Sequence, residues 1–199
     1  TTSGSFLVSG IRDSGGTATS GNSITGNTIS SISANSSNTA VGPGVAGIET
    51  SSGGTTIQRN SVSGVNNIHT TTYGAAGINV SAGNNAVVRN NFVSGVTGDM
   101  TGGGAFSTTF GIFGIRVATG TGHQVQNNSV NMYGARAGTA NSSLLTAALG
   151  IVSTASAGMD IRNNIFANNI TGGTTSIANV SVYLPSGGTS AMNLTNNYN

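Results

Sequence analysis

Few side chains in this sequence could carry acid–base or metal chemistry. The 199 residues include only four acids, Asp13, Glu49, Asp99 and Asp160. Hydrolysis of a glycosidic bond needs two carboxylates that face each other across that bond, and Ca²⁺ prefers several oxygen ligands with net negative charge. Acids this far apart in the chain can form either site only if the fold brings them together.

Metal-binding side chains other than the acids are also scarce. The chain has no cysteine and two histidines, His69 and His123. With no thiolate and few carboxylates to complete a ligand set, we expect both histidines at the surface, no metal site and no cofactor.

Arginine supplies all the positive charge, because the six basic residues are Arg12, Arg59, Arg89, Arg116, Arg136 and Arg162. Charged residues make up 5% of the chain, against roughly a quarter in ordinary soluble domains. Nucleic-acid binding needs clustered cations that displace counterions from phosphates, so scattered arginines predict no nucleic-acid partner. No apolar run approaches the roughly 20 residues that span a bilayer, and we expect no membrane insertion.

Aromatic side chains offer one possible binding chemistry, which is stacking on sugar rings. The segment 97–113 holds three phenylalanines, Phe106, Phe110 and Phe113. They are candidate glycan contacts, although aromatic residues more often anchor a core or a loop.

Internal repeats dominate the sequence and decide its fold. A segment of the form x-Ile-x-Asn-Asn-x-Val recurs, and three of its positions form columns. The first column is aliphatic and contains Ile24, Ile57, Val88, Val125, Ile161 and Leu194. The second is invariant and contains Asn27, Asn60, Asn91, Asn128, Asn164 and Asn197. The third is apolar in all copies but the last and contains Ile29, Val62, Val93, Val130 and Phe166.

Two further patterns accompany these columns. A Gly-Ile signature precedes most copies, at Gly47, Gly77, Gly114 and Gly150. Another apolar column follows the Asn and contains Ile32, Val65, Val96, Tyr133 and Ile170. The spacing between columns is not helical, and β-branched residues flanked by Gly and Asn have poor helix propensity, so helical repeats are excluded.

The columns predict an all-β chain that forms one domain over residues 1–199, a right-handed parallel β-helix (β-solenoid) of about six coils. Successive coils lie about 4.8 Å apart, so equivalent residues lie on top of one another. Aliphatic columns then form a dry core, and the Asn side chains form an internal Asn ladder whose amides bond to each other. We also expect each ladder Asn at a bend, because Asn tolerates the left-handed conformation.

In this arrangement no two acids share a column or lie in adjacent coils. We therefore predict no catalytic carboxylate cluster and no enzymatic activity. Arg89 and Arg162 occupy equivalent positions just after the first apolar column. That row is either a solvated outer surface or a strip that binds an anionic glycan.

The repeats resemble the parallel β-helix repeat of pectate-lyase-like proteins, most clearly from Asp160 to Phe166. The resemblance implies the fold, whereas the superfamily includes lyases, glycoside hydrolases, phage tailspikes, adhesins and surface proteins. The Asn-rich, Lys-free composition is similar to that of secreted bacterial surface proteins.

Repeat-like sequence extends to both ends of the chain, so we expect either a piece of a longer solenoid or a subunit that stacks head to tail on other copies. The residues expected at such an interface are Phe6, Leu7, Val8, Leu194, Asn197 and Tyr198. A head-to-tail contact does not close on itself and builds filaments. The leading hypothesis is a structural subunit of an extracellular filament or cell-surface layer. The alternatives are a carbohydrate-binding or adhesive segment of a larger secreted protein and, least favoured, a polysaccharide lyase or glycoside hydrolase.

Overall fold

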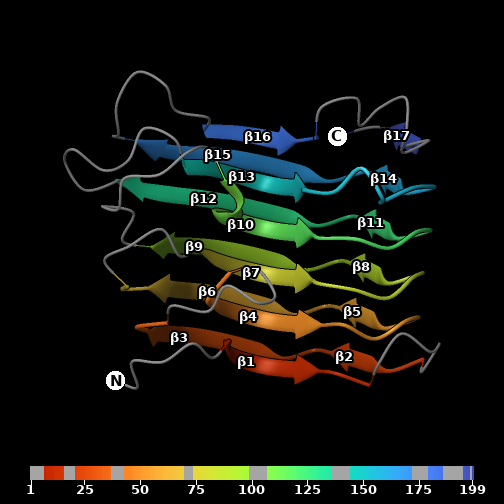
Figure 1. The fold of residues 1–199 in the computed structure, drawn as a ribbon, viewed down its shortest axis with the longest axis horizontal. Helices are drawn as coiled ribbons and strands as arrows, with labels where there is room; N and C mark the ends of the chain where they lie inside the picture. The colour runs from red at the N-terminus through yellow and green to blue at the C-terminus, as the bar shows by residue number, and fades with distance from the viewer. Residues whose placement is uncertain are drawn as a thin grey trace.

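The computed structural model describes residues 7–15, 21–36, 43–69, 74–98, 107–135, 144–171, 179–185, 195–197 and 199. This part of the chain forms strands that are parallel to their neighbours and stack into three sheets. Figure 1 shows the stack from the red N-terminal coil to the blue C-terminal coil. No helix in the described residues is long and apolar enough to cross a membrane.

Each of the first five coils contributes one strand to each sheet, and the last described coil contributes one strand to each of sheets one and two. Sheet one contains β1 (Val8–Asp13), β4 (Val45–Thr50), β7 (Ala75–Val80), β10 (Ser107–Val117), β13 (Leu144–Ile151) and β16 (Asn179–Tyr183). Sheet two contains β2 (Ser23–Thr25), β5 (Thr56–Gln58), β8 (Val87–Arg89), β11 (Gln124–Gln126), β14 (Asp160–Arg162) and β17 (Thr195–Asn197). Sheet three contains β3 (Thr28–Ala34), β6 (Ser61–Asn67), β9 (Phe92–Gly98), β12 (Ser129–Ala135) and β15 (Ile165–Thr171). This order confirms the predicted all-β parallel solenoid.

The aliphatic columns of the sequence form the interior of the solenoid. Ile24, Ile57, Val88, Val125 and Ile161 lie over one another in sheet two and are all buried. The neighbouring column Ile29, Val62, Val93 and Val130 is also buried. Each buried side chain of this kind contributes roughly 1.5–3 kcal/mol by leaving water.

The Gly of the Gly-Ile signature permits close packing between sheets one and three. A Cβ on Gly77 would lie 2.3 Å from Val93 Cγ1 and 2.7 Å from the carbonyl oxygen of Gly114. A Cβ on Gly47 would meet Val62 in the same way. These distances are too short for any side chain, so only glycine fits.

The signature is out of register in β13. Arg116 lies beside Gly150, and Ile115 lies beside Leu149, so the predicted alignment of Gly150 with Gly114 is wrong by two residues. Gly150 instead leaves room for the ring of Phe113, because a Cβ at Gly150 would lie 2.4 Å from that ring.

The bend beside the ladder is made by the residue before each Asn rather than by the Asn itself, which corrects the expectation from the sequence. The residues with a left-handed backbone at this bend are Gly26, Arg59, Asn90, Asn127 and Asn163, with φ between 54° and 70°. The ladder Asn is therefore selected for its side-chain amide, and the preceding residue for its backbone.

The apolar column after the ladder contains Met132 instead of the predicted Tyr133. In the earlier coils a left-handed residue such as Gly64 or Gly95 lies inside the strand and separates the two inward side chains by three positions. Strand β12 has no such residue at that place, so its inward side chains alternate normally. Met132 is fully buried, and Tyr133 is half exposed.

Candidate functional site

The Asn ladder lies at the corner between sheets two and three and extends through every described coil. After the first coil, the Oδ1 atom of each ladder Asn accepts two hydrogen bonds from the Asn of the preceding coil. For Asn91, the donors are the backbone N and the Nδ2 of Asn60, both at 3.0 Å. The same pair of bonds joins Asn27 to Asn60, Asn91 to Asn128 and Asn128 to Asn164.

The amide of each interior ladder Asn is fully satisfied inside the stack. Nδ2 of Asn128 donates to Oδ1 of Asn164 at 3.0 Å and to the carbonyl of Val88 at 2.9 Å. Its two protons and the two lone pairs of Oδ1 are thus all used. Because these hydrogen bonds replace those to water, the ladder Asn side chains can be buried. Those at most 3% exposed are Asn60, Asn91, Asn128 and Asn164.

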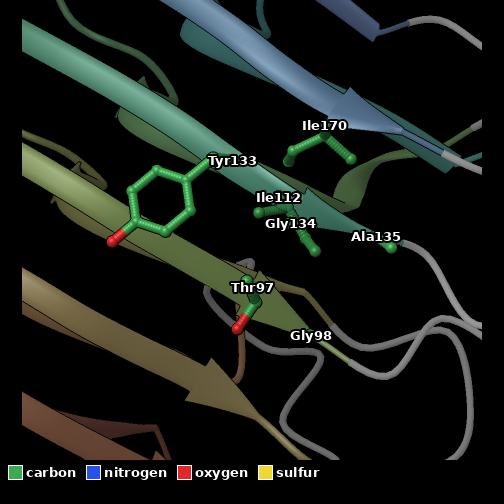
Figure 2. A pocket seen from close by; sticks show the side chains of 7 residues that line it. All are labelled: Thr97, Gly98, Ile112, Tyr133, Gly134, Ala135 and Ile170. Carbon is green, nitrogen blue, oxygen red and sulfur yellow. The ribbon is translucent and has the colours of Figure 1, made fainter.

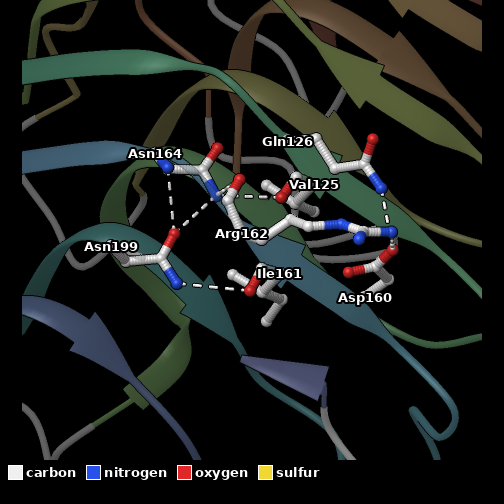
Figure 3. A network of polar contacts seen from close by, with 7 residues as sticks. All are labelled: Val125, Gln126, Asp160, Ile161, Arg162, Asn164 and Asn199. Carbon is white, nitrogen blue, oxygen red and sulfur yellow. Dashed lines mark hydrogen bonds and ion pairs between the residues drawn. The ribbon is translucent and has the colours of Figure 1, made fainter. Parts of the chain in front are cut away.

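The last position of the ladder is Asn199, not the predicted Asn197. Asn199 Oδ1 accepts from the backbone N and Nδ2 of Asn164 at 3.0 and 2.9 Å (Figure 3). Strand β17 pairs Asn197 with Arg162 and Asn196 with Ile161. The segment 193–199 contains several Asn residues, so its sequence is compatible with two registers, and the structure adopts the one shifted by two residues.

The Asn-to-Asn bonds of the ladder have one direction, because each Asn donates to Oδ1 of the next Asn toward the C-terminus, while its second Nδ2 proton goes to a main-chain carbonyl of the preceding coil, as Asn60 shows. In the first coil, Asn27 donates to Asn60. In the described part of the chain nothing donates to Oδ1 of Asn27. This acceptor therefore marks the N-terminal end of the ladder.

Among the described residues, the first coil lies at an open end of the solenoid. Strands β1, β2 and β3 are the outermost strands of their sheets. A hollow of about 380 Å³ lies there, lined by Gly10, Ile11, Asn27, Thr28, Ile29, Ser30 and Ile32. The hollow is thus lined by side chains of the core columns and by the Asn that carries the ladder acceptor.

In the described part of the chain, the opposite end also leaves a core column exposed. Val182 of β16 continues the inward column of Ile78, Ile115 and Leu149, which are fully buried. Val182 is nevertheless 42% exposed. An inward side chain with this exposure indicates that the described residues leave the last coil of sheet one open.

The predicted interface residues are only partly described. Leu7 and Val8 are half-buried, and Val8 packs against the core in β1. Phe6, Leu194 and Tyr198 lie outside the described residues.

The predicted glycan contacts do not form an exposed platform in the described part. Phe113 is fully buried against Ala76, Leu145 and Ala147, which contradicts its assignment as a surface contact. Both faces of sheet one are covered here, and every residue of β4 and β7 is buried. Phe106 lies outside the described residues, and for Phe110 only its place in β10 is defined.

A polar stack is buried on the outer face of sheet one. Nδ2 of Asn79 donates to Glu49 Oε2 at 2.5 Å, and Nη1 of Arg116 donates to Asn79 Oδ1 at 3.1 Å. Burial raises the pKa of Glu49 to about 7, although a hydrogen bond from Ser81 and the charge of Arg116 act in the opposite direction. Burial also lowers the pKa of Arg116 to about 10. The guanidinium lies 5.8 Å from the centre of the Phe113 ring.

Asp13 belongs to a separate polar network. Its carboxylate accepts hydrogen bonds from Ser52, Thr55 and Asn22 at 2.7–2.8 Å. Burial alone would raise the pKa of Asp13, but these hydrogen bonds together lower it. Asp13 and Glu49 do lie in adjacent coils, since β1 pairs with β4, which corrects the expectation that no acids would. Their side chains have different partners, and no cluster of acids and histidines that could hold a metal ion occurs among the described residues.

His123 is a core residue rather than the expected surface histidine. It is 1% exposed. Its Nδ1 accepts from the backbone N of Ala86 at 3.1 Å, so Nε2 carries the proton and donates to the carbonyl of Thr119 at 3.0 Å. Burial lowers the pKa of His123, while the bond to Thr119 acts against that shift. The neutral imidazole is thus a structural link between coils. His69 is half-exposed.

The arginine row lies on the outer face of sheet two, as predicted. Arg89 Nε donates to Gln58 at 2.9 Å, and Arg162 pairs with Asp160, which also accepts from Gln126 (Figure 3). These interactions tie the row to its own neighbours. A solvated outer surface explains them without a ligand.

Comparisons with known proteins supply no relative for this chain. No protein-family model, no curated protein and no solved structure matches it. The parallel β-solenoid therefore rests on the structure itself, and any function must be argued from the surfaces described above.

Proposed function

We propose that the chain is a structural subunit that stacks head to tail on copies of itself and builds an extracellular filament or cell-surface layer. Two resemblances support the proposal. The repeats resemble those of pectate-lyase-like proteins, and the composition is similar to that of secreted bacterial surface proteins. The observation that carries it is the directional Asn ladder, which presents an acceptor, Oδ1 of Asn27, at the open N-terminal coil.

A copy placed against the first coil can extend the ladder by the rule that every internal coil follows. In that rule the preceding Asn donates its backbone N and its Nδ2 to Oδ1 of the next Asn. The ladder residue of the last coil is Asn199. Its amide in one copy would thus meet Asn27 in the next, and the two ends are complementary rather than identical.

The exposed apolar side chains favour the same contact. Ile11 and Ile32 line the hollow at one end, and Val182 is exposed at the other. Ile11 and Val182 belong to the same inward column, so stacking would continue that column across the junction. The low charge of the chain adds little repulsion between copies.

The proposal is tested with two variants that each block one end. Ile32→Lys places a charge in the hollow of the first coil, and Val182→Lys places one on the last coil. Purified chain 1–199 should form filaments visible by electron microscopy, and each variant alone should stay monomeric in sedimentation velocity. A mixture of the two variants should give dimers and nothing longer, because one intact end of each remains.

A matched control is Ser33→Lys, which adds the same charge to an exposed residue of β3 that does not line the hollow. This variant should assemble like the unmodified chain. A monomeric unmodified chain at high concentration would overturn the proposal, and so would a mixture of the two blocked variants that forms no dimer.

A further inference from the structure

The outer surface of sheet three differs from the rest of the molecule because it has no charge. The five strands β3, β6, β9, β12 and β15 contain no Asp, Glu, Lys or Arg. We call the outward side chains of these strands the neutral face. It presents hydroxyl and amide groups in register, such as Ser30, Ser63 and Asn131, whose column also contains the buried Ser94.

Large exposed apolar side chains interrupt this polar surface at three places. Phe92 is 48% exposed, Tyr133 50% and Ile165 67%. Phe92 and Ile165 occupy one column with Ser129 between them, so their backbones lie about 9.6 Å apart, two coil spacings. Phe92 and Tyr133 are aromatic, so each presents an exposed ring face on a regular, uncharged sheet.

Tyr133 lies on the neutral face in a defined orientation. Its ring leans over β9, where a Cβ on Gly95 would lie only 3.0 Å from the phenolic oxygen (Figure 2). Glycine at this position leaves room for the ring. A cavity of about 20 Å³ beside it is lined by Thr97, Ile112 and Ile170, among others. That volume holds about one water molecule, so a ligand would lie on the surface rather than in a pocket.

We propose that the neutral face binds a neutral polysaccharide, whose sugar rings stack on Phe92 and Tyr133 while its hydroxyls bond to Ser and Asn side chains between them. The C–H groups of a pyranose ring pack against the face of an aromatic ring, and its hydroxyls pair with uncharged donors and acceptors. An anionic polymer would find no cation here, and neither would a nucleic acid.

Chemistry also favours a polysaccharide over a protein partner. The three apolar side chains are separated by Ser and Asn residues and do not merge into the continuous apolar core of a protein interface. A polymer that presents hydroxyls at regular intervals matches the hydroxyl and amide groups that recur from coil to coil beside the two rings. This inference does not depend on end-to-end assembly.

The test measures retention of the purified chain on insoluble cellulose, chitin and β-1,3-glucan, with polygalacturonate as the anionic comparison. We expect retention on at least one of the neutral polymers and none on the anionic one. Replacing both aromatic residues, Phe92→Ala with Tyr133→Ala, should weaken retention about tenfold or more. The exchange Phe92→Tyr with Tyr133→Phe should preserve it, because both rings remain.

The control is Arg89→Ala with Arg162→Ala on sheet two, which should leave retention unchanged. Thermal melting checks that every variant is folded, as expected for substitutions of exposed side chains. No retention on any of the three neutral polymers overturns the proposal, as does stronger retention on polygalacturonate. If the double alanine variant is retained normally, or loses only self-association, the face has another role and the proposal also fails.

Discussion

At the scale of single residues, the interior ladder Asn side chains matter because each one forms hydrogen bonds with three neighbouring residues. Asn128 accepts two bonds from Asn91 and donates to Val88 and Asn164. Removing one partner from a buried hydrogen bond costs the desolvation of the groups left behind, about 1–3 kcal/mol each time.

Asn128→Leu should therefore lower the free energy of unfolding by about 2 kcal/mol or more. Asn128→Asp keeps an acceptor for Asn91 but loses both donors and adds a buried charge, so it should be destabilising at neutral pH and less so in acid. Denaturant unfolding measures both. Asn131→Leu, on the exposed surface of the same coil, should change stability by only about 0.5 kcal/mol, and an equal loss in this control would contradict the role given to the ladder.

Glu49 makes a pH-dependent contribution of the opposite sign from most carboxylates. Its pKa in the folded chain is about 7, raised from 4.5. The folded state thus binds the proton more tightly between these values, and stability from this group falls as pH rises from 4.5 through 7. The cost of the ionised form above pH 7 is about 3 kcal/mol.

Glu49→Gln mimics the protonated acid at every pH. Relative to the unmodified chain, this variant should gain stability as pH rises from 5 to about 8.5, by up to about 3 kcal/mol. Using the difference between the two proteins removes the contribution of His123, whose lowered pKa makes stability fall as pH drops below 6.5. Melting curves across this range measure the difference, and a pH-independent difference would show that Glu49 is not buried as described.

At the scale of strands, the glycine column sets how closely sheets one and three can approach. Gly77→Ala should destabilise by about 1–3 kcal/mol, because the methyl group meets both Val93 and a backbone oxygen. Gly98→Ala is the matched control, since its nearest contact is the tip of Ile112 at 3.3 Å. Chemical denaturation should rank the two variants in this order, and equal effects would contradict the proposed close packing.

Strand register shows which parts of the fold the sequence could predict. The Asn and aliphatic columns were predictable because stacked coils repeat the same environment at each position. Asn197, Gly150 and Tyr133 were misassigned for local reasons: a run of Asn that fits two registers, a glycine selected by Phe113, and a strand without a left-handed residue. His123 gave no signal, because its burial depends on backbone partners from neighbouring coils.

The surface sites were less predictable than the core. Phe113 was chosen for its aromatic character, but sheet one is covered on its outer face and buries it. Phe92 and Tyr133 are exposed because they point outward from sheet three, and their direction follows from register rather than residue type. A periodic pattern identifies columns well and distinguishes inner from outer faces only where alternation is regular.

At the scale of the whole molecule, the solenoid is a stack of similar coils, and such a stack is stabilised mainly by contacts between neighbours. Its end coils have one neighbour fewer, which is visible in the exposure of Val182 and in the hollow beside Ile11.

Thr28→Pro tests strand pairing at the open edge of the first coil without adding charge. By the pattern of Ser61, whose backbone N donates to Asn27, the backbone N of Thr28 faces the open side of the first coil. The variant should melt like the unmodified chain and fail to form filaments, whereas unaltered filaments in electron micrographs would contradict pairing at this edge.

Hydrogen exchange of the Asn side-chain amides, followed by NMR, tests the central claim most directly. In dilute, monomeric protein the amides of Asn60, Asn91 and Asn128 should exchange far more slowly than that of the exposed Asn131, with Asn27 intermediate. After assembly, Asn27 should become as protected as the interior ladder residues. Rapid exchange at Asn91 and Asn128 would contradict the ladder. An exchange rate of the Asn27 amide that does not change on assembly would contradict the continuation of the ladder from one molecule to the next.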